Sequence, residues 1–277
     1  MTDKGDIAGH YAREGRLSEK ILELARQHRV SPEGPLTVAD LATFDQFHLR
    51  ARQGTAELAE LAQPAPGSLV LDIGAGIGGP ARQLAESCAV TVVALDLTEA
   101  YCRDAATLSA AVGLEQKVLA CCADAGRLPF PDATFDLVWT QHAAMNVPDK
   151  QALYRDAARV LKPGGRFALH DVMAGPAGPP HYPTPWASRA DQSFLMPPER
   201  IRELIASSGL TELAWEDRTD ALLADERAQA ARQSGAERPP GPYMLYAGFL
   251  ELSRNVRRSL VENRARVVIG LFAKPEA

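Results

Sequence analysis

The sequence predicts an α/β fold in which a doubly wound sheet of seven strands is covered by helices. From residue 68 onward, short apolar runs bounded by turn residues alternate with segments of helical periodicity, as in repeated β–α–β units. The first apolar run, SLVLDIG, leads into a glycine-rich turn and a helical segment. The late pairing of helix and strand patterns over 211–275 favours a reversed seventh strand.

The first 62 residues are expected to form a helical N-terminal cap. Apolar residues at helical spacing predict a helix over 16–28, which the Pro and Gly residues at 32–35 end. Two more helices are expected at 37–43 and 50–62, and the turn-rich QPAPG separates them from the core, residues 63–277.

The core is expected to alternate regularly between strands and helices. The expected strands are 68–74, 90–96, 117–124, 135–141, 166–172, 211–219 and 266–275. The expected helices are 78–87, 98–112, 150–161, 197–210 and, with an interruption near 234–242, 221–263. The stretch at about 174–198 is rich in Pro and Gly but carries aromatic residues, and loops of this length often act as lids. We therefore expect a lid insertion there.

Composition excludes several classes of partner. The formal net charge is -5 and the pI about 5.7, whereas nucleic acids and anionic membranes require a concentrated basic face. No apolar run approaches the roughly 18 residues of a membrane span, and the N-terminus lacks the apolar region of a signal peptide. A cytoplasmic protein is expected, as a monomer or homodimer. The four cysteines lack metal-ligand spacing, so no metal site is expected.

The segment LVLDIGAGIGGPA carries the strongest functional signal. Glycines let the chain turn sharply off a strand and let a ligand approach the backbone, and the following helix offers unpaired N–H groups. The spacing is ambiguous, because Gly74, Gly76 and Gly79 fit the G-x-G-x-x-G of dinucleotide enzymes. Gly74, Gly76 and Gly78 equally fit the G-x-G-x-G of methyltransferases. This loop alone does not choose the cofactor.

Three acidic residues refine the choice. Asp96 ends the second strand and can accept hydrogen bonds from both ribose hydroxyls, although a helix N-cap is the alternative role and Thr98 the better cap. Asp72 lies inside the first strand, where a dinucleotide enzyme usually has an apolar residue, and could face the ammonium of a methionine group. Asp124 follows the third strand and can accept the exocyclic amine of adenine. Asp96 suits either cofactor, whereas Asp72, Asp124 and the reversed seventh strand favour S-adenosylmethionine over a nicotinamide.

Four consecutive segments resemble the motifs of the class I S-adenosylmethionine-dependent methyltransferases, which have a Rossmann-like fold. They are VLDIGAGIGG, ALDLT, ADAGRLPFPDATFDLVWTQHAAMNV and ARVLKPGGRFALHDV, in unbroken order over roughly residues 40–275. The similar groups methylate small molecules: sarcosine/dimethylglycine and phosphoethanolamine N-methyltransferases, and ubiquinone and tocopherol C-methyltransferases. DQFHLRARQGTAELAELA resembles the cap helix of the sarcosine/dimethylglycine group, and PTPWA its lid. Leu49-Arg50-Ala51 departs from that group, where small residues are expected, which puts the inherited substrate in doubt.

The resemblance implies a site for S-adenosylmethionine and its product S-adenosylhomocysteine. The glycine turn would follow the methionine and ribose, the end of the second strand would hold the ribose, and the segment after the third would hold adenine. The implied cofactor residues are Asp72, Gly74, Ala75, Gly76, Gly78, Asp96, Leu97, Asp124, Ala125 and Gln141. Gln141 and His142 would lie near the sulfonium and the acceptor.

Methyl transfer requires mainly alignment and exclusion of water, and a base only if the nucleophile must lose a proton. His142 is the first catalytic candidate, because the carboxyl ends of parallel strands line the ligand site, and a structural histidine is the alternative. His48, on the expected cap helix, is the second candidate, and a helix-surface residue is the alternative. His170 could pair with Asp171 as a base and its orienting carboxylate, or be buried at the strand end.

Aromatic residues are candidates for contacting the acceptor, because their rings suit a cationic amine or a flat ring. These residues are Tyr11, Tyr182, Trp186 and Phe194, with packing of the lid as the alternative. The expected function is methylation of a small molecule at an amine nitrogen, or at an oxygen or carbon of a secondary metabolite. The alternatives are an NAD(P)-dependent oxidoreductase and a non-catalytic nucleoside-binding partner subunit.

Overall fold

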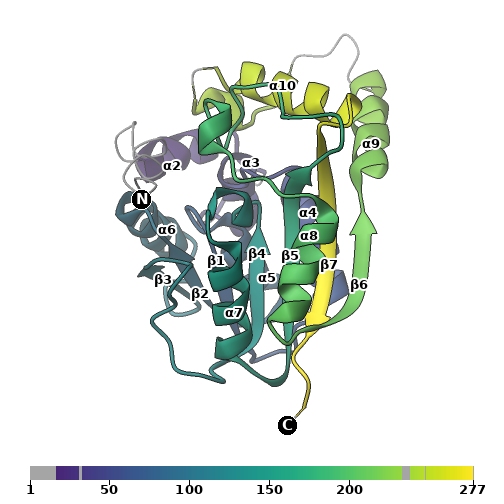
Figure 1. Ribbon diagram of the computed structural model, residues 1–277. Helices are drawn as coiled ribbons and strands as arrows, with labels where there is room; N and C mark the ends of the chain where they lie inside the picture. Colours follow the sequence, from purple (N-terminus) through teal and green to yellow (C-terminus); the bar gives the residue numbers. More distant parts are fainter. Residues whose placement is uncertain (1–16, 31–32, 233–237, 247, 277) are drawn as a thin grey trace.

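A computed structural model describes residues 17–30, 33–232, 238–246 and 248–276, which form one seven-stranded sheet in the order β3-β2-β1-β4-β5-β7-β6 (Figure 1). Neighbouring strands from β3 to β5 are parallel, whereas β7 is antiparallel to both β5 and β6. The predicted α/β fold with a reversed seventh strand is confirmed. The strands are β1 (Leu69–Ile73), β2 (Thr91–Asp96), β3 (Val118–Cys122), β4 (Phe135–Gln141), β5 (Leu161–Ala174), β6 (Thr211–Asp217) and β7 (Ala265–Ala273).

Helices cover both faces of the sheet, because side chains on each strand alternate between two apolar clusters. On β4, Val138 joins the cluster under α7 and α8, while Leu137 and Trp139 join the cluster under α4 and α5. The helices are α2 (Leu17–Gln27), α3 (Val38–Asp45), α4 (Ala51–Ala62), α5 (Gly79–Cys88), α6 (Glu99–Ala111), α7 (Lys150–Val160), α8 (Pro198–Ser207), α9 (Thr219–Arg232) and α10 (Phe249–Val261). Among the described residues, no helix has the length and hydropathy needed to cross a membrane.

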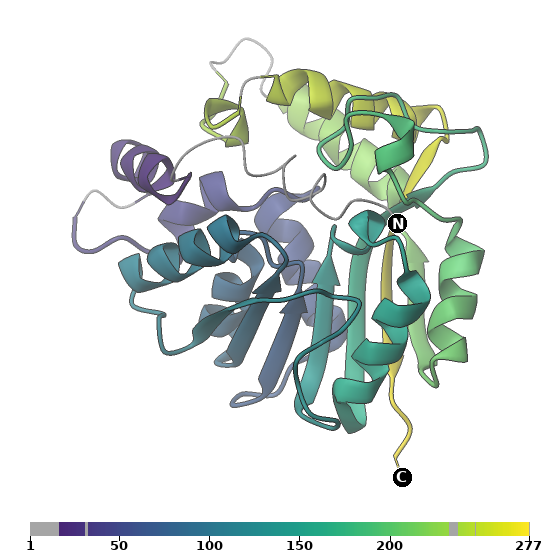
Figure 2. The same ribbon diagram turned by 60° about the vertical axis from the view of Figure 1, so that its left-hand side comes forward.

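The carboxyl ends of the parallel strands all point toward α2, α3, α10 and the segment 175–197 (Figure 1), and Figure 2 shows the same arrangement from the side. Segment 175–197 contains one short 3-10 helix, Ala190–Gln192. Trp186 from this segment packs in an apolar cluster with Leu222 of α9 and Val256 of α10. The segment is therefore anchored to the C-terminal helices beside this edge of the sheet.

The helices α2 to α4, called the cap helices below, dock on α5 through a buried ion pair. Arg82 of α5 is fully buried, and its Nη2 donates to Asp45 Oδ2 and to the Ile77 carbonyl, both at 2.8 Å. Its Nη1 donates to Ser109 Oγ of α6 at 3.2 Å. A Cβ added at Gly79 would lie 2.2 Å from the Asp45 carbonyl oxygen, so only glycine lets the end of α3 come this close.

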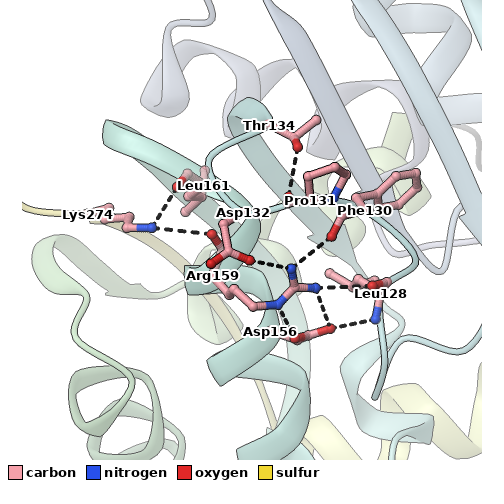
Figure 3. A network of polar contacts seen from close by, with 9 residues as sticks. All are labelled: Leu128, Phe130, Pro131, Asp132, Thr134, Asp156, Arg159, Leu161 and Lys274. Carbon is pink, nitrogen blue, oxygen red and sulfur yellow. Dashed lines mark hydrogen bonds and ion pairs between the residues drawn. The ribbon is translucent and has the colours of Figure 1, made fainter.

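A second arginine orders the loop between β3 and β4 at the opposite end of the molecule (Figure 3). The Arg159 guanidinium on α7 donates to the Phe130 carbonyl at 2.8 Å and to the Leu128 carbonyl at 3.1 Å. Asp156 and Asp132 balance its charge at 2.7 and 2.8 Å. These contacts hold the LPFPDATFD segment on α7.

The main difference from the expected elements is the start of β5. LKPGG was expected to end a helix in a turn, but it forms the first part of β5. Its backbone bonds to the chain after β7: Gly164 N–H donates to the Lys274 carbonyl at 3.0 Å, and Lys274 N–H donates to the Gly165 carbonyl at 2.8 Å. A distant segment therefore supplies the partners that extend the strand.

Removing Arg82 tests the docking of the cap helices. In Arg82→Met the buried Asp45 carboxylate loses its partner, so we expect the free energy of unfolding to fall by about 3–5 kcal/mol in urea denaturation. The control is Arg103→Met, which removes an exposed pair with Glu99 at 2.7 Å and should change the free energy by less than about 0.5 kcal/mol. Equal losses in the two variants would contradict this account of the docking.

Candidate active site

The turn after β1 presents bare backbone beside the ends of β2 and β4. Gly74, Gly76 and Gly78 have φ angles of 74°, 55° and 78°, which side chains rarely tolerate. A Cβ added at Gly74 would lie 2.2 Å from Ala143 Cβ, so glycine lets the chain after β4 approach the turn. Nothing lies within 4 Å of a Cβ added at Gly76. The turn therefore leaves space for a ligand beside its backbone.

Asp96 is oriented across this turn. Its Oδ2 accepts the Gly76 N–H at 2.9 Å, and its Oδ1 accepts the Thr98 N–H at 2.8 Å. Burial raises the pKa of the Asp96 carboxyl, and these backbone donors oppose that rise. Thr98 is the N-cap residue of α6, as predicted, although its side chain makes no capping hydrogen bond. Leu97, between them, is 39% exposed and so remains available to a ligand.

Asp72 is an unusual residue for a buried strand. Its carboxyl group is buried and Oδ2 has no hydrogen-bond partner among the described residues. Burial, together with the charge of Asp96, raises the pKa of Asp72 to about 8. An unpaired carboxylate oxygen in this position lowers stability unless a donor or cation reaches it. A ligand ammonium would supply such a partner.

Asp124 and Ala125 follow β3, on the same edge of the sheet. The Ala123 N–H donates to the Asp96 carbonyl at 3.0 Å, which carries the pairing of β2 and β3 beyond the end of β3. Asp124 Oδ1 then accepts the Gly126 N–H at 2.9 Å. The fold thus places the three predicted acidic residues at the carboxyl ends of three adjacent strands, β1, β2 and β3.

Three histidines from distant segments gather beside this edge. The ring centroids of His142 and His170 are 4.8 Å apart, and those of His48 lie 5.9 Å from His142 and 6.3 Å from His170. His142 directly follows β4 with a φ of 51°, and His170 lies within β5. The two predicted catalytic candidates, His48 and His142, are therefore brought together.

One expectation about these histidines is wrong, and one open alternative is decided. His48 was expected on a helix, but it lies in the turn between α3 and α4, half-buried against the sheet rather than on a helix surface. For His170, a pair with Asp171 and burial at the strand end were both open, and the side chain is buried. Successive residues of a strand point to opposite faces, so His170 meets the other histidines while Asp171 lies near the Lys150 ammonium.

Gln141, the last residue of β4, connects the histidines. Its Nε2 donates to His48 Nδ1 at 3.1 Å and to His170 Nδ1 at 3.2 Å. Its Oε1 accepts the Thr55 hydroxyl at 3.2 Å, and His48 Nε2 donates to Gln46 Oε1 at 2.7 Å. Both amide hydrogens that we expected near the cofactor are thus donated to histidines. Gln46 and Thr55 lie in the segment that resembles the cap helix, but the sequence did not single them out, because their contacts with His48 and Gln141 depend on how that segment packs on the sheet.

All three rings are neutral at physiological pH. Burial lowers the pKa of His48 to about 4 and that of His170 to about 3. Burial also lowers the pKa of His142 well below its usual value, and the neighbouring His170 and His48 rings add to this effect. His142 Nε2 is buried and has no partner among the described residues. An unprotonated imidazole nitrogen can accept a proton or hydrogen bond from a ligand.

The aromatic residues of segment 175–197 mainly pack the segment. Trp186 is 4% exposed, and its Nε1 donates to Ser193 Oγ at 3.1 Å, which favours the packing role. Tyr182 packs against the same apolar cluster. The Phe194 N–H donates to the Met145 carbonyl at 3.2 Å and ties the segment to the chain after β4. Tyr11 lies outside the described residues, and acceptor contacts by these aromatics stay a prediction.

Metal coordination is not evident in the part of the chain that the structure describes. No group of three or more His, Cys, Asp or Glu side chains there has an arrangement that could hold an ion. The Nδ1 atoms of His48 and His170 face the Gln141 amide rather than a common point.

Comparisons with known proteins agree with this geometry. A family model described as a methyltransferase domain matches residues 71–169. The chain is 29% identical over 220 residues to the sarcosine/dimethylglycine N-methyltransferase of Halorhodospira halochloris. The match covers 75% of this chain and 79% of that protein. It is also 36% identical over 138 residues to the 27-O-demethylrifamycin SV methyltransferase of Amycolatopsis mediterranei. That match covers 50% of this chain and 46% of that protein.

A solved structure shares the fold over nearly the whole chain. It is the geranyl diphosphate C-methyltransferase of Streptomyces coelicolor A3(2), in complex with S-adenosyl-L-homocysteine among other ligands. The TM-score is 0.71 at 18% identity, and the match covers 99% of this chain and 98% of that one. The likeness shows the fold.

The pKa of Asp72 gives a pH-dependent prediction. Between its usual value of 3.8 and about 8, the unfolded chain has lost this proton while the folded protein keeps it, so stability falls as pH rises through that range. We expect Asp72→Asn to be more stable to urea than the unchanged protein at pH 8.5, by at least about 1 kcal/mol, with the gain vanishing near pH 4.

Asp136→Asn is the control of opposite sign. Partial burial raises the pKa of Asp136, but hydrogen bonds from Lys162 and the Leu69 N–H outweigh it, so the pKa is lowered. This variant should lose stability at neutral pH, and the loss should shrink as the pH falls below the usual carboxyl range. A stability gain in Asp72→Asn that did not depend on pH would show that the carboxyl is not protonated in the folded state.

Proposed function

We propose that this chain methylates a hydroxyl oxygen of a small organic molecule. The proposal starts from the family: the chain belongs to the class I S-adenosylmethionine-dependent methyltransferases, and its acceptors are small molecules. The observation that supports a hydroxyl is His142, whose neutral ring holds an unpartnered Nε2 beside the glycine turn. A hydroxyl must lose its proton during methyl transfer, and a positioned imidazole can accept it.

The residues present fit S-adenosylmethionine, which supplies a methyl group on a positively charged sulfur. We propose that the free Oδ2 of Asp72 receives the methionine ammonium and that the open backbone at Gly76 receives the ligand beside it. Asp96, whose oxygens are fixed by two backbone donors, would accept the ribose hydroxyls. Asp124 and Ala125, at the end of the next strand, would contact the adenine.

His142 would then orient the acceptor and accept its proton. The ring stays neutral at physiological pH, so its unprotonated nitrogen is available without prior loss of a proton. Leaving that nitrogen unpaired costs about 1–3 kcal/mol, and an acceptor hydroxyl would remove this cost on binding. His48 lies at 5.9 Å, centroid to centroid, and would limit the space around the acceptor.

An amine nitrogen is the second candidate acceptor. It is supported by the similarity to the sarcosine/dimethylglycine N-methyltransferase, which covers 79% of that protein. A tertiary amine carries no proton when it attacks, so it needs alignment and exclusion of water but no base. With a tertiary amine such as dimethylglycine, the His142 nitrogen would have no proton to accept. A secondary amine such as sarcosine loses its proton only after the N–CH3 bond forms, whereas a hydroxyl must lose it during transfer, and for this reason we favour the hydroxyl.

The choice between the acceptors is tested with methyl-labelled S-adenosylmethionine. The protein would be incubated with a panel of hydroxyl-bearing secondary metabolites and with a panel containing sarcosine and dimethylglycine, and labelled products would be identified by mass spectrometry. We expect transfer to a hydroxyl. Turnover of the amines alone would overturn the hydroxyl proposal and leave the family assignment intact.

The role of His142 is tested by His142→Gln. We expect kcat to fall by about 10²–10⁴-fold, because the acceptor hydroxyl loses its proton acceptor. Binding of S-adenosylhomocysteine, measured by calorimetry, should stay unchanged. His28→Gln, which alters an exposed histidine at the end of α2, is the control and should retain full activity. Full activity in His142→Gln would exclude His142 as the base.

Cofactor binding at Asp72 should be coupled to a proton. The carboxyl group is mostly protonated at pH 7, because burial raises its pKa to about 8. An ammonium placed beside it lowers that pKa, so S-adenosylhomocysteine binding should release close to one proton. Calorimetry at pH 7 in buffers of different ionisation enthalpy measures this release. Asp72→Asn should bind more weakly and release none; release by this variant would place the titrating group elsewhere.

A further inference from the structure

We propose that Gln141 is a positioning residue: its side-chain amide joins the turn between α3 and α4 to the end of β4 and fixes His48 and His170 in one tautomer. The proposal rests on the proposed function, because the ring that this arrangement aligns is His142. Gln141 was expected near the cofactor; because its amide nitrogen faces His48 and His170, the proposal gives it a role through these rings instead of contact with the methyl group or the acceptor.

Counting donors and acceptors determines the tautomers. The Gln141 amide nitrogen has two hydrogens and lies 3.1 Å from His48 Nδ1 and 3.2 Å from His170 Nδ1, so each hydrogen has one ring acceptor. A neutral ring that accepts at Nδ1 carries its hydrogen at Nε2. His48 has two further contacts. Its Nε2 lies 2.7 Å from Gln46 Oε1, which can only accept and so agrees, whereas its Nδ1 also lies 3.2 Å from the Leu49 carbonyl, which competes with the Gln141 amide for that nitrogen. The shorter contact to Gln46 and the Gln141 hydrogen together favour the Nε2–H form.

The other end of the amide is also held. The hydroxyl of Thr55 on α4 is fully buried and lies 3.2 Å from Gln141 Oε1 and 3.1 Å from Gln46 Oε1, so its single hydrogen is shared between these two acceptors. A Cβ added at Gly54, the residue before it, would lie 3.1 Å from His170 Cε1, so α4 packs directly over that ring. The amide therefore cannot turn over without breaking contacts to the turn, to α4 and to β5.

The charges around the rings explain why a neutral amide occupies this position. Burial and the positive charges of Arg50 and Arg218 oppose protonation of His170, as a proton on His48 would. Arg50 is paired with Glu57 and Asp225, and Arg218 with Glu216 and, at 3.5 Å, with Glu57. Among the described residues, no carboxylate hydrogen-bonds to His48, His142 or His170. Gln141 supplies donors to two rings without adding charge.

Gln141 and His170 together determine the position of His142. His142 directly follows Gln141, its N–H donates to the His170 carbonyl at 2.8 Å, and its ring contacts the His170 ring. Loosening the amide would free the turn that carries His48 and the chain that carries His142. We therefore expect effects on the chemical step rather than on cofactor binding.

Two substitutions of Gln141 test this role. Gln141→Met keeps the length and removes both donors, so kcat should fall about 10–100-fold while the Kd for S-adenosylhomocysteine stays within about twofold. Gln141→Glu keeps the shape but offers only acceptor oxygens, so at least one of His48 and His170 must carry a proton on Nδ1. The pKa of that ring should rise toward neutrality and add a titration between pH 5 and 8 to the pH profile.

The direct measurement is the tautomer of each ring, from long-range ¹H–¹⁵N correlation spectra of the whole protein, assigned with His48→Asn and His170→Asn. We expect Nε2–H tautomers for both rings in the unchanged protein, and an Nδ1 proton on at least one in Gln141→Glu. Nδ1–H tautomers in the unchanged protein would overturn the proposal. So would a Gln141→Met variant in which the tautomers and kcat are unchanged, or whose main defect is weaker S-adenosylhomocysteine binding.

Gln83→Met is the matched control. Gln83 is as buried as Gln141, at 6% exposure, and bonds to Gln46 and the Arg52 carbonyl but to no histidine. Because Gln83 Oε1 accepts the Gln46 amide that faces His48, the comparison is made on His170. Gln83→Met should lose stability without changing the His170 tautomer; a change of that tautomer equal to the one in Gln141→Met would reduce Gln141 to a structural role. The tautomer spectra need no acceptor, so failure of the proposed hydroxyl chemistry leaves that part of the test intact.

Discussion

The candidate active site, at the carboxyl ends of the parallel strands, depends on the close contact between the end of α3 and the first turn of α5. Gly79 permits the approach, and the buried pair of Arg82 and Asp45 stabilises it. Gln46 and His48 follow Asp45 closely in the chain. The same contact therefore determines where the turn between α3 and α4 lies on the sheet. Without this contact, His48 would not be held beside His142 and His170.

The site tolerates polar groups that a fold selected for stability alone would avoid. Asp72 Oδ2 and His142 Nε2 are both buried and have no partner in the part of the chain that the structure describes, and each lowers stability by leaving hydrogen-bonding capacity unused. Such local violations concentrate where ligands bind, because the missing partner arrives with the ligand. The two atoms lie at the ends of adjacent strands, β1 and β4, on either side of the glycine turn. Their positions therefore mark the two sides of one site.

Much of the fold could be predicted because the relevant interactions are local in sequence. Turn residues and the two periodicities located the strands and α-helices of the core, and the glycine turn with Asp72 and Asp96 indicated the edge of the sheet where we propose that the cofactor binds. The misses have non-local causes. β5 begins early because Lys274, more than a hundred residues away, bonds to its first residues. The partners of the buried His170 ring are His48 and His142, which come from distant segments.

By itself, the sequence determined the doubly wound sheet, the reversed last strand and the line of acidic residues at the strand ends, since each follows from neighbouring residues and from the shared direction of parallel strands. Only the tertiary structure decided that His48, His142 and His170 form one group around Gln141, and that Gln46 and Thr55 complete it. These residues come from a turn, a helix and two strands spread over more than a hundred positions. No periodicity or motif records their distances, because only the packing of the cap helices on the sheet brings them together.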